Sequence, residues 1–161
     1  FNASGADREG EIGERHTPET HLIPLALMAA YGTGPALKVF GTDYETPDGT
    51  CIRDYIHVED LAQAHVLAMA HLTRGGESFA ANLGTGQGAS VLEVIAAVEQ
   101  ATGRSVPVTF EARRAGDPAA LTADPQLAQV RLGFRAKHRD LAQTVADAAP
   151  WFAPQVEALV R

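Results

Sequence analysis

The sequence is poor in several residue types, and each shortage excludes a class of protein. Its 161 residues include a single cysteine, Cys51, which excludes an internal disulfide and fits a reducing compartment such as the cytoplasm. Lysine and arginine number 13 against 20 aspartates and glutamates, a net charge of −7 that argues against a nucleic-acid partner. No apolar run approaches the roughly 20 residues needed to span a bilayer, so we expect no membrane partner.

The residues that are present suit an ordinary folded domain. Hydrophobic residues make up 45% of the chain and charged residues 20%, enough apolar surface for a core at this length. Strand-like and helix-like segments alternate, which predicts an α/β fold with a partly parallel sheet. The opening FNASGAD resembles the end of a strand, so we expect the sequence to be the later part of something longer.

Local signals place the individual elements along the chain. The best defined helix, 90–103, begins with Ser90 and Glu93 at capping-box spacing and stops at Gly103. Apolar alternation predicts the other elements. Helices are expected at 21–32, 59–72, 125–133 and 140–152, and strands at 36–41, 51–58, 78–84 and 106–112, of which 78–84 is expected to be buried.

Three features invite a catalytic or cofactor role that their spacing does not support. The glycines of NLGTGQGAS do not complete the G-x-G-x-x-G pattern of a dinucleotide loop, which favours a structural turn. His57, His65 and His71 lack i, i+4 spacing and no cysteine cluster accompanies them, so no metal site is predicted. Cys51 is expected to be a buried, inert thiol.

Two arginine-bearing stretches give a clearer signal. Arg53 interrupts an apolar strand, where a charge is costly without a partner, and the adjacent Asp54 should point to the opposite face. In RRAGDP, a short turn after a strand, Arg113, Arg114 and Asp117 either converge on one ligand or form a solvated turn with a surface ion pair. A guanidinium suits a phosphate, and a carboxylate suits a vicinal diol.

Taken together, five stretches resemble the C-terminal half of the UDP-glucose 4-epimerases, a family of extended short-chain dehydrogenases/reductases. They are FNASGAD…GEIGE, HLIPL, VFGTDYETPDGTCIRDYIHVEDLA, NLGTG…SV and RRAGDP. RDYIHVEDLA resembles many nucleotide-sugar epimerases and dehydratases, whereas the GTDYETPDGT insertion is more particular to the 4-epimerases. The resemblance implies that residues 1–161 form the UDP-sugar-binding C-terminal domain of a Rossmann-type enzyme, a mixed sheet with flanking helices.

The resemblance also implies roles for residues in the first part of the chain. Asn2 would contact the diphosphate region of a UDP-sugar, and Phe1 would lie close to the nicotinamide of NAD and the sugar. Leu22 would offer a backbone N–H to the diphosphate from the start of its helix, a position suited to anions. Lys38 and Phe40 fall in the segment that would frame the uracil.

Later residues complete the implied site. Arg53 and Arg114 would hold the diphosphate, and Asp117 the uridine ribose. Leu121 occupies a position where family members vary between bulky and small residues, a choice that affects tolerance for an N-acetyl group. Leucine is bulky but flexible, so acceptance of N-acetylated sugars stays open.

The family's catalytic and NAD-binding motifs are missing from this sequence. It contains no G-x-x-G-x-x-G turn, and no lysine stands four residues after Tyr31, Tyr44 or Tyr55. We therefore expect the catalytic pair and most of the NAD site on an N-terminal portion, and this chain alone to be inactive. The implied substrates are UDP-glucose and UDP-galactose, and the implied partners are that portion and a second copy in a homodimer. The alternatives are another nucleotide-sugar enzyme, such as a 4,6-dehydratase, or a fragment that only binds a UDP-sugar.

Overall fold

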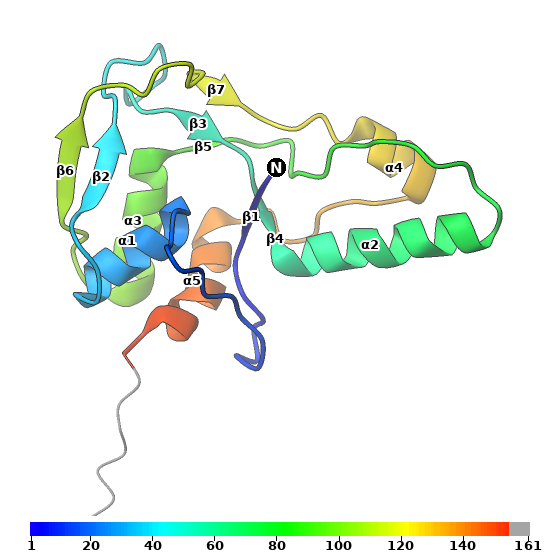
Figure 1. The fold of residues 1–161 in the computed structure, drawn as a ribbon, viewed down its shortest axis with the longest axis horizontal. Helices are drawn as coiled ribbons and strands as arrows, with labels where there is room; N and C mark the ends of the chain where they lie inside the picture. The colour runs from blue at the N-terminus through cyan, green and yellow to red at the C-terminus, as the bar shows by residue number, and fades with distance from the viewer. Residues whose placement is uncertain (155–161) are drawn as a thin grey trace, which may run out of the picture.

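The computed structural model describes residues 1–154, and its elements alternate between strands and helices (Figure 1). No helix within these residues is long and apolar enough to cross a membrane. In chain order the elements are β1 (Asn2–Ser4), α1 (Leu22–Tyr31), β2 (Leu37–Phe40), β3 (Ile52–Arg53), β4 (Tyr55–His57), α2 (Val58–Thr73), β5 (Ala89–Ser90), α3 (Val91–Thr102), β6 (Val108–Glu111), β7 (Ala120–Leu121), α4 (Gln126–Leu132) and α5 (Leu141–Phe152).

The strands form three small sheets. β1 pairs with β4 and β2 pairs with β6, both in parallel. In the third sheet, β3 lies between β5, which is antiparallel to it, and β7, which is parallel. The α/β class with a mixed sheet, predicted from the alternation of segments, is therefore confirmed.

Helices α1, α3 and α5 gather on one side of the molecule beside β2 and β6 (Figure 1). The expected capping box of α3 is present, because Ser90 Oγ accepts from Glu93 N and Glu93 Oε2 accepts from Ser90 N. Gly32 and Gly103 end α1 and α3 in the left-handed conformation, as predicted. The three helices bury one cluster, the larger core, whose members include Ile23, Ala26, Leu27, Val39, Val94, Val98, Val145 and Ala148.

The prediction of a single strand at 51–58 is wrong, because this stretch is divided at Asp54 into β3 and β4. The backbone N–H of Asp54 donates to Leu121 O, whereas its carbonyl accepts from Asn2 N. β3 and β4 thus face different partners and belong to different sheets. The division leaves Asp54 at the junction of two sheets, with its side chain fully buried.

The helix expected at 59–72 is present as α2, and it buries only part of its apolar surface. Ala64 is buried, but Leu72 is 52% exposed, and Val66 and Met69 on the same helix are also exposed. α2 and α4 share the smaller core, whose buried members are Ile56, Ala64, Ala128 and Phe134.

The buried strand expected at 78–84 is also wrong. These residues form no strand, Phe79 and Leu83 are half-buried, and Asn82 is exposed. A strand needs a neighbour to satisfy its backbone groups, and no strand in the described part of the chain pairs with this segment. The amine of Phe1, the residue before β1, donates a hydrogen bond to Leu83 O, 3.0 Å long.

Candidate functional site

A cavity of about 490 Å³ lies against the larger core, between the start of α1, strands β2 and β3 and the turn before β7. We call it the arginine cavity because two arginines line it. Segments far apart in the sequence meet there. Six of the nine residues implicated by the sequence line it: Leu22, Lys38, Phe40, Arg53, Arg114 and Asp117.

Arg53 has an ionic partner inside the cavity, and that partner is not Asp54. Its Nη2 forms an ion pair with the carboxylate of Asp117, and its Nη1 donates to the carbonyl of Ile52 at 2.6 Å. The two charged side chains are 14% and 27% exposed, so solvent still reaches both. The charge of Arg53 is thus balanced by a carboxylate 64 residues later in the sequence, and both side chains line the arginine cavity.

The two adjacent arginines of the RRAGDP turn point to different places. Arg114 lies over the ring of Phe40, with its guanidinium carbon 3.8 Å from the ring centroid, and lines the cavity. Arg113 instead donates to Asp43 Oδ1 at 2.6 Å and lies over the ring of Tyr44. One guanidinium of the pair is therefore available to the cavity, and the other is engaged outside it.

The start of α1 offers the cavity an uncapped helix N-terminus. No side chain caps it, so the N–H of Leu22 is suited to an anion. Just before it, Glu19 Oε1 accepts from the backbone N–H groups of Thr20 and His21 at 2.7 and 2.8 Å. Burial raises the pKa of Glu19, but the hydrogen bonds from His21 and Thr20 outweigh it and lower the pKa below its ordinary value.

Phe1 and Asn2 line a neighbouring cavity of about 630 Å³, the β1 cavity, which shares Glu19 with the arginine cavity. Asn2 Nδ2 donates to the carbonyl of Asp54 at 2.7 Å, which orients the amide and leaves its second hydrogen free for a ligand. The Phe1 side chain is 42% exposed. Both residues therefore line the neighbouring cavity and not the arginine cavity.

Leu121 lines neither of these two cavities. It is the ladder partner of Arg53 in the parallel pairing of β3 with β7, so both side chains lie on one face of that sheet. Leu121 is 49% exposed.

Three further ionisable residues line the arginine cavity that the sequence analysis did not assign to a site: Glu19, Cys51 and Tyr55. Burial raises the pKa of the Tyr55 hydroxyl, so the group stays protonated and can donate. Tyr55 stands two residues after Arg53, and strand alternation was a signal for it. Burial also raises the pKa of the Cys51 thiol, which makes it a poor nucleophile. Nothing in the sequence around Glu19 indicated that this residue would line the cavity.

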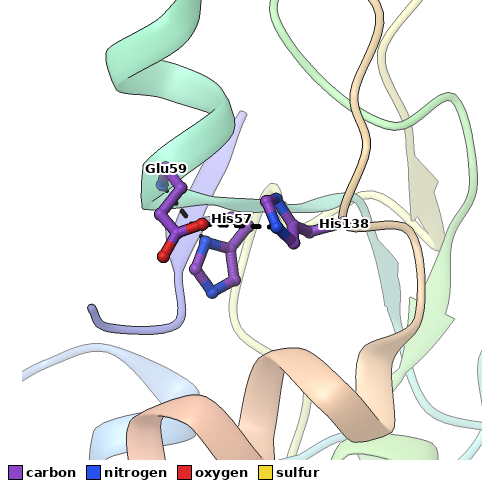
Figure 2. A group of neighbouring side chains, drawn as sticks. All are labelled: His57, Glu59 and His138. Atoms are coloured by element: carbon purple, nitrogen blue, oxygen red, sulfur yellow. Dashed lines mark hydrogen bonds and ion pairs between the residues drawn. The ribbon is translucent and has the colours of Figure 1, made fainter. Parts of the chain in front are cut away.

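A second group of polar side chains lies at the start of α2, away from the arginine cavity. Figure 2 shows the ring of His57 between Glu59 and His138. His57 Nδ1 accepts from the backbone N–H of Glu59 at 3.1 Å, and Nε2 lies 3.4 Å from Asp147 Oδ2. Since the lone pair of the neutral ring already caps α2, His57 has none left for a metal ion, and the geometry favours a structural cap.

A family model described as "NAD dependent epimerase/dehydratase family" matches residues 3–84, just over half of the chain. The chain belongs to this family. The matched segment includes β1 to β4 and supplies Arg53, whereas Arg114 and Asp117 come from the part that follows it.

Individual relatives place the chain more closely within the family. It is 52% identical over 153 residues to UDP-glucose 4-epimerase of Rhizobium leguminosarum bv. trifolii, covering 95% of this chain and 46% of that protein. The crystal structure of UDP-glucose 4-epimerase from Brucella ovis in complex with NAD matches with a TM-score of 0.91 and 61% identity, covering 94% of this chain and 47% of that one. The Bifidobacterium longum enzyme in complex with NAD+ and UDP matches with a TM-score of 0.86 and 42% identity, covering 94% and 45%.

These matches confirm the resemblance to UDP-glucose 4-epimerases and the Rossmann-type α/β class. The chain spans about half the length of the curated relatives that it matches.

Proposed function

We propose that this chain is the UDP-sugar-binding portion of an NAD-dependent UDP-glucose 4-epimerase. The observation that carries the proposal is the convergence of Arg53, Arg114 and the uncapped start of α1 on one cavity of a chain with net charge −7. A relative of known structure binds UDP and NAD+. The relatives are UDP-glucose 4-epimerases, which favours this activity over the 4,6-dehydratase alternative.

Different lining residues of the arginine cavity would bind different parts of a UDP-sugar. Arg53 and Arg114 would donate charge-assisted hydrogen bonds to the diphosphate, together with the N–H of Leu22. Asp117 would accept from the ribose hydroxyls. Phe40 and the stem of Lys38 would frame the uracil.

The hexose would lie toward the edge of the cavity, near Asn2, Phe1 and Leu121. Holding UDP firmly and the hexose loosely suits an epimerase, because the sugar must turn over between two hydride transfers while the nucleotide stays in place. Accepting UDP-glucose and UDP-galactose alike follows from such a loose hold. This chain would therefore supply positioning rather than proton transfer.

The residues of this chain fit only one edge of an NAD site. The exposed ring of Phe1 at the β1 cavity can offer an apolar surface to the nicotinamide, but the sequence contains no dinucleotide glycine motif. The chemistry that bound NAD supplies is reversible removal of a hydride from the sugar. We propose that the remaining part of the whole protein holds most of the cofactor and the catalytic residues, and that this chain alone is inactive.

The same remaining part is the partner that we propose for the exposed apolar surface of this chain. Val66, Met69 and Leu72 on α2 lie exposed, and no strand among residues 1–154 pairs with the segment 78–84. An N-terminal portion that adds strands beside β1 would cover both. We also propose that the whole protein works in the cytoplasm, in galactose metabolism, and forms a homodimer.

Calorimetric titration of UDP into the full chain at low salt tests the proposal. We expect a dissociation constant in the micromolar range, about −8 kcal/mol. Arg114→Ala should weaken binding by about 1.5 to 3 kcal/mol, the scale of a charge-assisted hydrogen bond. Arg113→Ala is the matched control and should leave the affinity unchanged, because Arg113 is engaged by Asp43 and Tyr44.

Two results would contradict the proposal. One is an equal effect of Arg113→Ala and Arg114→Ala, which would remove the arginine cavity as the site. The other is no binding of UDP to the chain either alone or after addition of the N-terminal portion of the Brucella ovis relative.

A further inference from the structure

Asp54 is a buried aspartate whose carboxylate forms no ion pair with a cationic side chain among residues 1–154. Its side chain is fully buried, and its carboxylate accepts four hydrogen bonds from two distant segments. Oδ1 accepts from Thr85 N at 2.9 Å and Thr85 Oγ1 at 2.8 Å, and Oδ2 accepts from Gly86 N at 2.9 Å and Ala123 N at 3.2 Å. Such a set satisfies a buried carboxylate as completely as an ion pair would.

This arrangement gives the glycine-rich stretch 84–88 a function that its spacing did not reveal. A side chain at Gly84 would stand 2.4 Å from Ala123 Cβ and 2.8 Å from Asp54 Oδ2, so only glycine allows this approach. The backbone N–H groups of the loop do bind an anion, as in a phosphate loop, but that anion is a side chain of the same chain.

The main chain of Asp54 extends the same junction to two residues of the candidate site. Its carbonyl accepts from both N and Nδ2 of Asn2, at 3.1 and 2.7 Å, and its N–H donates to the carbonyl of Leu121 at 3.3 Å. Arg53, its neighbour in sequence, lies on the opposite face of the backbone within the arginine cavity. The main chain of Asp54 is thus hydrogen-bonded to Asn2 and Leu121, and Asp54 directly follows Arg53 in the sequence.

We propose that Asp54 is a positioning residue, which fixes where Asn2 and Leu121 lie relative to Arg53 and thereby shapes the hexose side of the site. The inference rests on the proposed UDP-sugar function. The carboxylate holds the segment after β7 through Ala123, two residues beyond Leu121. Loosening that hold lets Leu121 and Asn2 shift, while Arg114 keeps its place over the ring of Phe40 in β2, which pairs with β6.

Asp54→Asn tests the proposal with little change in size. The new amide turns two hydrogens toward a ring of backbone donors, so at least one buried donor loses its acceptor. Asp60→Asn is a matched control, because Asp60 is also a buried aspartate that accepts from distant backbone N–H groups, those of Lys137 and His138, away from the arginine cavity. Both variants should lower the stability of the full chain.

Two readouts separate positioning from mere stability. Amide hydrogen exchange followed by NMR should become at least tenfold faster at Thr85, Gly86 and Ala123 in Asp54→Asn, relative to Asp60→Asn. Titrations of UDP and UDP-glucose should show that Asp54→Asn changes the ratio of the two affinities at least threefold. Asp60→Asn should leave this ratio as in the wild type.

Unchanged exchange at the three amides would overturn the proposal. Faster exchange with an unaltered affinity ratio would overturn it too, since Asp54 would then be structural only. If the wild type binds neither ligand, alone or after addition of the N-terminal portion of the Brucella ovis relative, the proposed function fails, and the inference about the hexose side fails with it. The exchange result still decides whether Asp54 anchors these segments. Should Asp54→Asn not fold, Thr85→Val removes one of the four donors and should move both readouts in the same direction by less.

Discussion

The two cores of this molecule differ in how completely the chain itself covers them. In the larger core, α1, α3 and α5 pack on one another, and Leu27, Val94 and Val145 are fully buried. In the smaller core, α2 presents Val66 and Met69 to solvent. The arginine cavity stands on the larger core, so the proposed grip on UDP is built where packing is complete.

The difference follows from where each element finds its neighbours. The strands and helices of the larger core pair within the chain, as β2 does with β6. The segment 78–84 has the composition of a strand and no strand beside it in the described residues. Since the chain spans about half the length of its relatives, the proposed N-terminal portion would complete the smaller core.

The largest effect should come from opening the larger core. Leu27→Ala removes a fully buried side chain of α1 and leaves a cavity, so the free energy of unfolding should fall by about 2 to 5 kcal/mol. Urea denaturation of the full chain measures it. Met69→Ala on the exposed face of α2 is the control and should change stability by less than about 0.5 kcal/mol. Equal losses would mean that the two cores are covered alike.

A second test adds charge to the exposed apolar face of α2. We expect the wild-type chain to self-associate through the apolar face of α2, because exposed apolar patches and unpaired edges associate. Val66→Lys combined with Met69→Lys should weaken association at least tenfold, about 1.4 kcal/mol, in sedimentation equilibrium. Lysine at Gln63 on the same helix is the control. A monomeric wild type would show that this face needs no cover.

A third test uses acid at the start of α2, where the two cores meet. Burial lowers the pKa of His57, and the nearby His138 lowers it further, against smaller opposing effects of Glu59, Asp147 and Asp60. The unfolded chain therefore binds this proton at higher pH than the folded chain. The stability that neutral His57 provides is complete above its ordinary pKa of about 6.5, and it is lost progressively as the pH falls from there through the lowered pKa of the folded state.

His57→Asn should flatten this loss of stability, since asparagine can cap α2 without titrating in that range. Urea denaturation between pH 7.5 and 5 measures the slope for the variant and the wild type. Substituting the exposed His65 in the same way is the control, and should leave the slope as it is. If both variants keep the wild-type slope, another group carries the acid sensitivity.

Local signals predicted the fold where they were sufficient, and failed where a distant partner decided the outcome. The ends of α1 and α3 followed from Gly32, Ser90 and Gly103, because caps act within one helical turn. The break at Asp54 did not follow, since it depends on Asn2 and Leu121, which lie more than 50 residues away in sequence. The strand predicted at 78–84 is absent for a related reason. The segment has the pattern of a strand, but no strand in the described residues pairs with it.

The candidate site shows the same division. Arg53 was singled out correctly as a charge in need of a partner, but its partner, Asp117, is set by tertiary structure. Tyr55 could have been found from alternation with Arg53, whereas nothing near Glu19 marks it as part of the cavity. Residue type and spacing alone did not distinguish Arg113 from Arg114, because their separation depends on Asp43 and Phe40. The family resemblance was what singled out Arg114.

The smallest effect should come from the ion pair at the polar edge of the larger core. In a cycle of Arg53→Ala, Asp117→Ala and the double variant, the coupling free energy for unfolding should be about 0.2 to 1 kcal/mol, because both side chains are partly exposed and water screens the pair. Raising the salt concentration should reduce it further. A coupling above about 2 kcal/mol that salt leaves unchanged would place the pair in a dry interior. A small coupling would instead mean that Arg53 can exchange the carboxylate for a phosphate at little cost in stability.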